Sequence, residues 1–341
     1  MMNEITHLPE DIILKVEDLD VRFYTYAGVV HAVSNVSFYV REGETIALVG
    51  ETGCGKSVTT RAITKLIESP GRIEGGKVLF RRRNGKIVDL LKISDEELRE
   101  IRGNEIAYVF QDPTSALDPL YTIGYHIHET IIAHKSKISK KETFKQAVNL
   151  LKHVLIPSPE VRVKNYPHEM SGGMRQRSVI AIGLSNMPRL LIADEPTTNL
   201  DVTVQAQILD LLKKIQEEYK MGLILITHNL GIVAEVADRV YVMYAGKMVE
   251  EGPLEQIFYN PQHPYTKLLL RAVPDPTKKI EKLESIPGVV PSLISPPAGC
   301  RFQPRCLYAM DICGRQEPPL VEVESEHRAA CWLLEKRGGS K

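Results

Sequence analysis

Residues 50–57 are Gly50-Glu51-Thr52-Gly53-Cys54-Gly55-Lys56-Ser57, which fits the phosphate-binding P-loop pattern G-x-x-x-x-G-K-[ST]. The preceding stretch 45–49 is apolar and rich in β-branched residues, which predicts a buried strand, and residues 58–67 predict a helix. Glycines let the backbone wrap around phosphate oxygens, and the amides at the helix N-terminus then face the anion. This order of strand, loop and helix predicts an α/β protein that binds a nucleotide.

Individual side chains around this loop have expected roles. Lys56 is expected to reach the β- and γ-phosphates, and Ser57 to hold Mg²⁺. Upstream, Phe23, Tyr24 and Tyr26 form an aromatic group; either one of them stacks on an adenine ring, or all three are edge-strand side chains. The candidates for binding the nucleotide at the loop are Gly50, Glu51, Thr52, Gly53, Cys54, Gly55, Lys56, Ser57 and Val58.

Length, charge and hydropathy exclude several classes of protein. The 341 residues can hold two or more domains. Lys plus Arg equals Asp plus Glu, at 43 each, so there is no global basic footprint for nucleic acid. The N-terminus is acidic and unlike a signal peptide, and no apolar run approaches the ~20 residues that cross a bilayer. We therefore expect a soluble, cytoplasmic protein that can sit on a membrane protein.

Three further apolar runs predict buried strands, and each ends in polar residues. The runs at 106–110, 190–193 and 223–226 lead to Gln111, to Asp194 with Glu195, and to His228. Ligands of α/β sheets bind at the carboxyl ends of the strands. We therefore expect Asp194 to position Mg²⁺, Glu195 to polarise an attacking water and His228 to sense the γ-phosphate.

The segments between these strands predict helices. Residues 122–154 have helical periodicity and separate two strand regions, which predicts an inserted helical subdomain. Ser171-Gly172-Gly173 opens a further helix and is a second possible anion site, although many helices begin with Ser-Gly. The stretch 198–201 predicts a tight turn that ends at Asp201 and leads into a helix at 202–219.

The last part of the chain differs in composition. Eight prolines between 261 and 297 predict an extended linker. The spacing C-x5-C-x6-C-x17-C of Cys300, Cys306, Cys313 and Cys331 is neither the usual zinc pairing nor a ferredoxin run. It leaves open zinc, an iron–sulfur cluster or unligated thiols. A segment with so little apolar content favours a metal staple over no metal.

Taken together, the P-loop, Gln111, Ser171-Gly172-Gly173, Asp194-Glu195, Asp201 and His228 resemble the ATP-binding cassette (ABC) family over about residues 13–255. The variant stretch 170–177 (MSGGMRQR), with 260–266 (NPQHPYT) and 299–306 (GCRFQPRC), looks like the ATPase subunits of oligopeptide, dipeptide and nickel importers. The resemblance implies a P-loop NTPase cassette over 1–255 with a helical subdomain at about 112–185. A Pro-rich linker over 256–297 and a small, irregular Cys-rich domain over 298–341 would follow.

The resemblance also implies roles for these residues. Two subunits would sandwich two ATP, with Ser171-Gly172-Gly173 capping the γ-phosphate in the partner's site. Gln111 would link metal and water to the helical subdomain, Glu195 would be the general base, and His228 would steady the γ-phosphate. Phe23 aligns best with the adenine-stacking aromatic, with Tyr24 and Tyr26 as rivals. The four C-terminal cysteines would hold a [4Fe–4S] cluster, with zinc as the alternative.

The implied function is an ATPase that powers uptake of short peptides, with nickel or another small solute as alternatives. Its implied partners are a sister ATPase in a heterodimer, two membrane permease subunits and an extracytoplasmic binding protein, with the chain peripheral on the cytoplasmic face of the membrane. A non-transport ABC ATPase acting on nucleic acid or ribosomes usually has two cassettes or a coiled-coil insertion, and neither occurs here. An iron–sulfur redox protein would not need the hydrolytic residues, and a GTPase would need an [NT]-K-x-D motif, which is absent.

Overall fold

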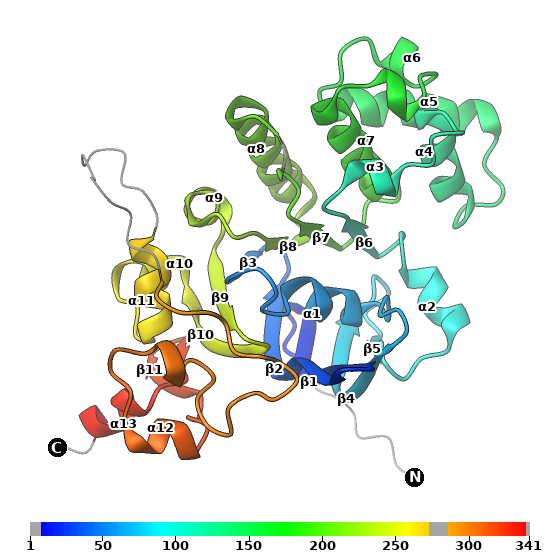
Figure 1. Ribbon diagram of the computed structural model, residues 1–341. Coiled ribbons are helices and arrows are strands. Elements are labelled where there is room, and N and C mark those ends of the chain that lie inside the picture. Colours follow the sequence, from blue (N-terminus) through cyan, green and yellow to red (C-terminus); the bar gives the residue numbers. More distant parts are fainter. Residues whose placement is uncertain (1–7, 199, 273–285, 339–341) are drawn as a thin grey trace.

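The computed structural model describes residues 8–198, 200–272 and 286–338 and is built around two sheets (Figure 1). The larger sheet has the order β11-β12-β10-β9-β3-β8-β7-β6. Its five parallel strands are β9 (Arg239–Tyr244), β3 (Thr45–Val49), β8 (Gly222–Ile226), β7 (Leu190–Asp194) and β6 (Ile106–Val109). Every residue of β3, β7 and β8 is buried, as expected for parallel strands covered on both faces. The predicted α/β class is confirmed, and so are the four predicted strands, which correspond to β3, β6, β7 and β8; β9 was not predicted from the sequence.

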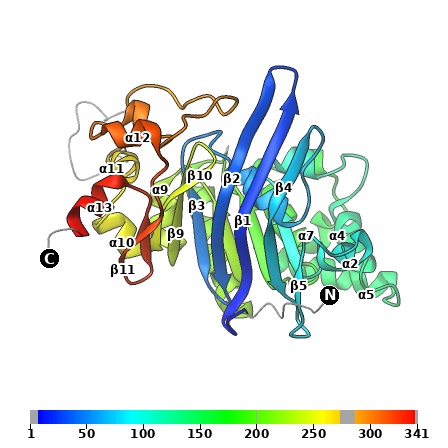
Figure 2. The same ribbon diagram turned by 90° about the horizontal axis from the view of Figure 1, so that it is seen from below.

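The smaller sheet is antiparallel and covers one face of the larger one. Its order is β2 (Gly28–Arg41), β1 (Ile12–Thr25), β4 (Gly71–Arg81) and β5 (Ile87–Asp89). Figure 2 shows the long strands β1 and β2 crossing in front of the larger sheet. Helix α1 (Lys56–Ile63) shares one core with both sheets, through side chains such as Ile63, Val16 and Leu48. It ends four residues before the predicted end at 67.

A group of helices lies beyond the β6 edge of the larger sheet (Figure 1). After α2 (Asp95–Ile101), they are α3 (Pro113–Ala116), α4 (Ile123–Ile132), α5 (Lys140–His153), α6 (Pro159–Arg162), a 3₁₀ turn (Pro167–Glu169) and α7 (Gly172–Leu184). Ser171 caps α7 by accepting a hydrogen bond from the Met174 amide. The apolar faces of α4, α5 and α7 form a second core together with β6, β7 and β8.

Helices α8 (Val202–Tyr219) and α9 (Leu230–Val236) cover the face of the larger sheet away from the smaller one. Asp201 caps α8, because its carboxylate accepts from the Val204 amide at 3.0 Å. The predicted helix at 202–219 is therefore confirmed, while residue 199 of the predicted turn lies outside the described residues. None of the helices in the described ranges is long and apolar enough to cross a membrane.

The C-terminal part begins with β10 (Lys247–Pro253), α10 (Leu254–Tyr259) and α11 (Pro264–Arg271). From residue 286 on, it contains a 3₁₀ turn (Gln303–Arg305), α12 (Asp311–Arg315), β11 (Val321–Glu324), β12 (His327–Ala329) and α13 (Trp332–Gly338). Strand β12 pairs with β10, so the C-terminal hairpin extends the larger sheet. Phe302 belongs to the same core cluster as Val49 of β3.

Two expectations for this part are wrong. The predicted linker over 256–297 is helical at 264–271, because Pro264 takes the first helical position, which needs no amide donor, and Tyr265 is buried. Its portion at 273–285 lies outside the described residues. The predicted separate domain at 298–341 shares its sheet and its core with the cassette, so no structural boundary falls at 298. Residues 339–341 lie outside the described ranges.

Candidate functional site

A cavity of about 540 Å³ opens where the P-loop meets the carboxyl ends of β7 and β8. It brings together residues far apart in sequence. Of the predicted site residues, those that line it are Phe23, Thr52, Gly53, Gly55, Lys56, Ser57, Val58, Gln111, Glu195 and His228. Tyr24 instead bonds Glu74, and Tyr26 is fully exposed, so neither rival of Phe23 lines the cavity.

The P-loop is closed around its own lysine. The Lys56 ammonium donates to the Gly50 carbonyl at 2.7 Å and to the Glu51 carbonyl at 3.1 Å, and its residue is only 6% exposed. Gly50 and Gly55 have positive φ, and a Cβ would come within 2.2 Å of the Met243 carbonyl oxygen or 2.4 Å of that of Ala32. These two positions therefore require glycine. Cys54 is buried behind the loop, and burial raises the pKa of its thiol.

Asp194 does not itself line the cavity but is paired with Ser57, which does. The Ser57 hydroxyl donates to Asp194 Oδ1 at 2.9 Å, and the Tyr108 hydroxyl donates to Oδ2 at 2.8 Å. Burial raises the pKa of Asp194, and these two hydrogen bonds oppose that shift. A hydroxyl and a carboxylate side by side fit the oxygen ligands that Mg²⁺ prefers, and a bound Mg²⁺ would neutralise charge on the β- and γ-phosphates.

Glu195 is held by three neighbours at the mouth of the cavity. Its Oε2 accepts from Gln111 Nε2 at 2.7 Å and from the Thr198 hydroxyl at 2.9 Å. Its Oε1 lies 3.1 Å from His228 Nδ1. The backbone of Glu195 is left-handed, with φ of 46°, a conformation that costs energy and is often found at functional sites. These contacts fix the carboxylate in a cavity that Lys56 and Ser57 also line.

The segment Ser171-Gly172-Gly173 does not line this cavity. Ser171 is exposed at the start of α7, and a Cβ on Gly173 would come within 2.8 Å of Val204. Asp201 is also exposed and is engaged in capping α8. Within a single chain, Ser171-Gly172-Gly173 and Asp201 therefore do not lie in the cavity that the P-loop lines.

Several residues of the site were missed by sequence reasoning. Val30 and Ala32 of β2 line the cavity, as do Thr198 and Leu293. Leu293 comes from the C-terminal region, and its carbonyl accepts from the His31 amide at 2.8 Å. Thr198 lies only three residues after Glu195, so its place in the site could have been predicted from this spacing. Leu293 offers none, because only the fold brings it to β2.

The four C-terminal cysteines line one small cavity together. Burial, with the neighbouring thiols adding to it, raises the pKa of Cys300 to about 11. In the described ranges, however, no group of three or more His, Cys, Asp or Glu side chains is arranged to hold a metal ion. This finding applies to zinc and to an iron–sulfur cluster alike, so the structure supports neither over the other. Four thiols around a shared cavity fit the donor set of a larger cluster, without showing its ligand geometry.

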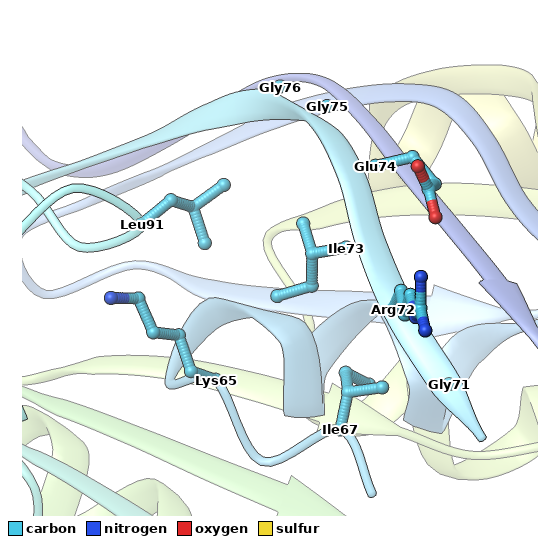
Figure 3. Close-up of a pocket in the computed structure, with 9 residues that line it drawn as sticks. All are labelled: Lys65, Ile67, Gly71, Arg72, Ile73, Glu74, Gly75, Gly76 and Leu91. Carbon is cyan, nitrogen blue, oxygen red and sulfur yellow. The ribbon is translucent and has the colours of Figure 1, made fainter. Parts of the chain in front are cut away.

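A second cavity, of about 420 Å³, lies outside the nucleotide site (Figure 3). Lys65 and Ile67 after α1 line it together with Arg72, Ile73 and Glu74 of β4, and Figure 3 shows the Ile73 side chain pointing from β4 toward Lys65. Its charged side chains all contact protein neighbours: Lys65 donates to the Ile93 carbonyl at 3.0 Å, Glu74 accepts from Tyr24 at 2.8 Å, and the Arg72 guanidinium lies over the Tyr24 ring, 5.2 Å from its centroid. This cavity therefore offers no free set of groups aimed at a ligand.

A P-loop that closes a cavity with a buried Asp–Ser pair and an oriented glutamate defines a nucleotide-binding protein of the P-loop class. Residues 33–198 match the family model described as ABC transporter, and residues 249–313 match that of the oligopeptide/dipeptide transporter, C-terminal region.

Relatives of known name agree with these matches. The dipeptide transport ATP-binding protein DppD of Lactococcus lactis subsp. cremoris (strain MG1363) is 48% identical, over 97% of this chain and 93% of that protein. The oligopeptide transport ATP-binding protein OppD of Bacillus subtilis (strain 168) is 51% identical, over 94% of this chain and 89% of that protein. The solved dimer of the ATP-binding cassette MJ0796 with ADP and Pi has a TM-score of 0.63 and 28% identity, over 71% of this chain and 99% of that chain. The chain belongs to the ABC transporter family, among the ATPase subunits of its oligopeptide and dipeptide transporters.

Proposed function

We propose that this ATPase binds MgATP in the cavity at the P-loop and that its hydrolysis energises import of dipeptides or oligopeptides. The proposal of ATP hydrolysis rests on the contacts that orient Glu195. Gln111, Thr198 and His228 hold its carboxylate. The Asp194–Ser57 pair belongs to the same site. The peptide substrate rests on the relatives, which are named for dipeptide and oligopeptide transport.

Each side chain has one role in the proposed reaction. Lys56 binds the β- and γ-phosphates, while Ser57 and Asp194 hold Mg²⁺. Glu195 takes the proton of the attacking water, and Gln111 and His228 keep its carboxylate pointed at that water. Phe23, across the cavity from the loop, stacks on the adenine.

The active unit in this proposal is a dimer with a sister ATPase, in which each subunit completes the other's site. The exposed start of α7, outside its own cavity, supports this arrangement, because Ser171-Gly172-Gly173 is free to cap a γ-phosphate in a partner. The solved MJ0796 cassette is likewise a dimer.

The helical subdomain is the proposed contact with two permease subunits, which places the chain on the cytoplasmic face of the membrane. A cavity of about 210 Å³ on this subdomain is lined by the exposed rings of Tyr125 and Phe144. Exposed apolar surface of this kind is typical of protein–protein contacts. An extracytoplasmic binding protein would deliver the peptide.

Reconstitution of the full assembly tests this function. The chain, its sister ATPase, the permeases and the binding protein are placed in vesicles, and phosphate release and peptide uptake are measured together. We expect peptide to stimulate hydrolysis, and Lys56→Ala to abolish uptake. Stimulation by nickel alone, with no response to any short peptide, would refute the proposed substrate.

We further infer that Cys300, Cys306, Cys313 and Cys331 hold a [4Fe–4S] cluster with a structural role. The support is their shared cavity and a donor set of four thiols. Protein purified without oxygen should contain four iron and four sulfide per chain, and any one Cys→Ser change should remove them. Iron-free protein from cells that load other clusters normally would exclude this cofactor.

A further inference from the structure

Glu51, the second residue of the P-loop, is held from two sides by the C-terminal part of the chain. Arg305 forms a two-pronged ion pair with its carboxylate, Nη1 to Oε2 at 2.6 Å and Nη2 to Oε1 at 3.1 Å. The backbone amide of Glu51 donates to the Tyr265 hydroxyl at 2.9 Å. The P-loop is therefore anchored to residues more than 200 positions away.

Further hydrogen bonds hold the Arg305 guanidinium in this position. Beyond Glu51, it donates to the carbonyls of Pro287 at 2.7 Å and Ile286 at 3.2 Å, and to the Tyr244 hydroxyl at 3.3 Å. These bonds and the pair with Glu51 use all five donors of the group. The side chain is only 4% exposed, so solvent does not compete for them.

The backbone carbonyl of Glu51 contacts the part of the P-loop that carries Lys56. Its carbonyl accepts from the Lys56 ammonium at 3.1 Å and from the Cys54 amide at 3.2 Å. Its carboxylate does not line the nucleotide cavity. The side chain of Glu51 thus points to Arg305, while its backbone helps to place the lysine that binds phosphate.

We propose that Arg305 is a positioning residue for the ATPase reaction: it fixes Glu51 and so holds the P-loop in the conformation that binds MgATP. The proposal rests on the nucleotide site proposed above. The C-terminal region is then a working part of the nucleotide site, acting through Arg305.

The size of the effect follows from the population of the competent loop. Apparent Kd equals the intrinsic Kd divided by the fraction of protein in the binding-competent conformation. If the freed loop is competent about a tenth of the time, the Kd for ATP rises about tenfold. Lysine can replace the charge of Arg305 but not its two-pronged pair, so Arg305→Lys should lie between the parent and Arg305→Ala.

The experiment measures equilibrium binding of a non-hydrolysable MgATP analogue to the full chain. The variants are Arg305→Ala, Arg305→Lys, Glu51→Gln and the double change Arg305→Ala with Glu51→Gln. We expect each single change to raise the Kd, and the double change to add little to Arg305→Ala, because both break the same contact. Steady-state hydrolysis in the assembled complex should show a raised KM, with kcat recovering at saturating ATP.

A matched control separates positioning from general destabilisation. Arg328 is also a C-terminal arginine that pairs with a cassette carboxylate, Glu251, with Nε to Oε1 at 2.7 Å, but it does not contact the P-loop. Arg328→Ala should lower stability and leave the Kd unchanged. Lys56→Ala tests the nucleotide site itself: if it binds the analogue normally, the site assignment fails independently of Arg305.

Two results would overturn the proposal. The first is a parental Kd in folded Arg305→Lys and Glu51→Gln, which stay decisive if Arg305→Ala does not fold. The second is an increase in Kd for Arg328→Ala as large as that for Arg305→Ala.

Discussion

Replacing Glu195 by glutamine removes a carboxylate charge while keeping the shape of the side chain. In the structure, Oε2 accepts from Gln111 and Thr198, and Oε1 faces His228 Nδ1. A glutamine amide can direct its oxygen to the first two donors and its NH₂ to an imidazole nitrogen that accepts. Because all three contacts survive, Glu195→Gln should keep the cavity and its ATP affinity.

Glu195→Gln should slow only the chemical step of ATP hydrolysis. A general base contributes ~10²–10⁴-fold to the rate. At ~1.4 kcal/mol for each factor of ten, its removal raises the barrier by ~3–5 kcal/mol. We therefore expect at least a ~100-fold fall in turnover. Unhydrolysed ATP should also keep the dimer closed.

Phosphate release from MgATP is the assay, measured in the assembled complex with the partner subunit's site disabled. Equilibrium nucleotide binding and gel filtration with ATP complete it. Glu195→Ala is the comparison, because alanine leaves Gln111, Thr198 and His228 without their shared partner and should disturb binding as well. A Glu195→Gln complex with parental affinity and turnover within tenfold of the parent would show that another group takes the proton.

The other predictions concern the base pocket, the dimer and pH. Phe23→Ala should raise the Kd for ATP several-fold, since an aromatic stack is worth ~0.5–1.5 kcal/mol beyond its area. Tyr24 lies outside the cavity, so Tyr24→Ala should leave the Kd for ATP unchanged. A raised Kd in Tyr24→Ala with an unchanged Kd in Phe23→Ala would show that Tyr24 stacks on the adenine instead. Ser171→Arg should preserve ATP binding by the single subunit but prevent the ATP-dependent dimer on gel filtration; a dimer of normal yield would contradict the proposed cap. Burial lowers the pKa of His263 to about 4 from an ordinary 6.5, so the unfolded chain takes up its proton first as pH falls. Stability to urea should fall by about 2 kcal/mol between pH 7 and pH 5 from this group. His263→Asn keeps an acceptor for the cap of α11 and should remove that share of the pH dependence; an unchanged slope would exclude His263 as its source.

Much of the nucleotide site was predictable because its residues follow a strand directly. Buried strands of a parallel sheet are apolar throughout, so the polar residue that ends each one stands out in the sequence. Gln111, Glu195 and His228 were found in this way, and the fold brings all three to one cavity. The residues alone did not decide which of Phe23, Tyr24 and Tyr26 faces the nucleotide. Alternation along β1 sets which ring faces the cavity, and the several register shifts in this strand cannot be predicted from the sequence.

The C-terminal part was not predictable by the same reasoning. Proline density predicts extended chain, but Pro264 occupies the first turn of α11, where a missing amide costs nothing. The pairing of β12 with β10 depends on contacts almost 80 residues apart, between Glu250 and Ala329, and no local pattern encodes it. The link between Arg305 and Glu51 spans 254 residues and was equally invisible.

The same contacts explain why the C-terminal region cannot act as an independent appendage. Phe302 is 1% exposed and packs against Tyr244 of β9 and Tyr265 of α11, with ring centroids 5.1 and 5.5 Å apart. Tyr244 is fully buried, and its hydroxyl accepts a hydrogen bond from Arg305, which also holds Glu51. Loosening this aromatic cluster would therefore free the arginine and, through it, the P-loop. If Arg305 positions the P-loop as proposed, whatever stabilises the C-terminal region would also stabilise the nucleotide site by this route.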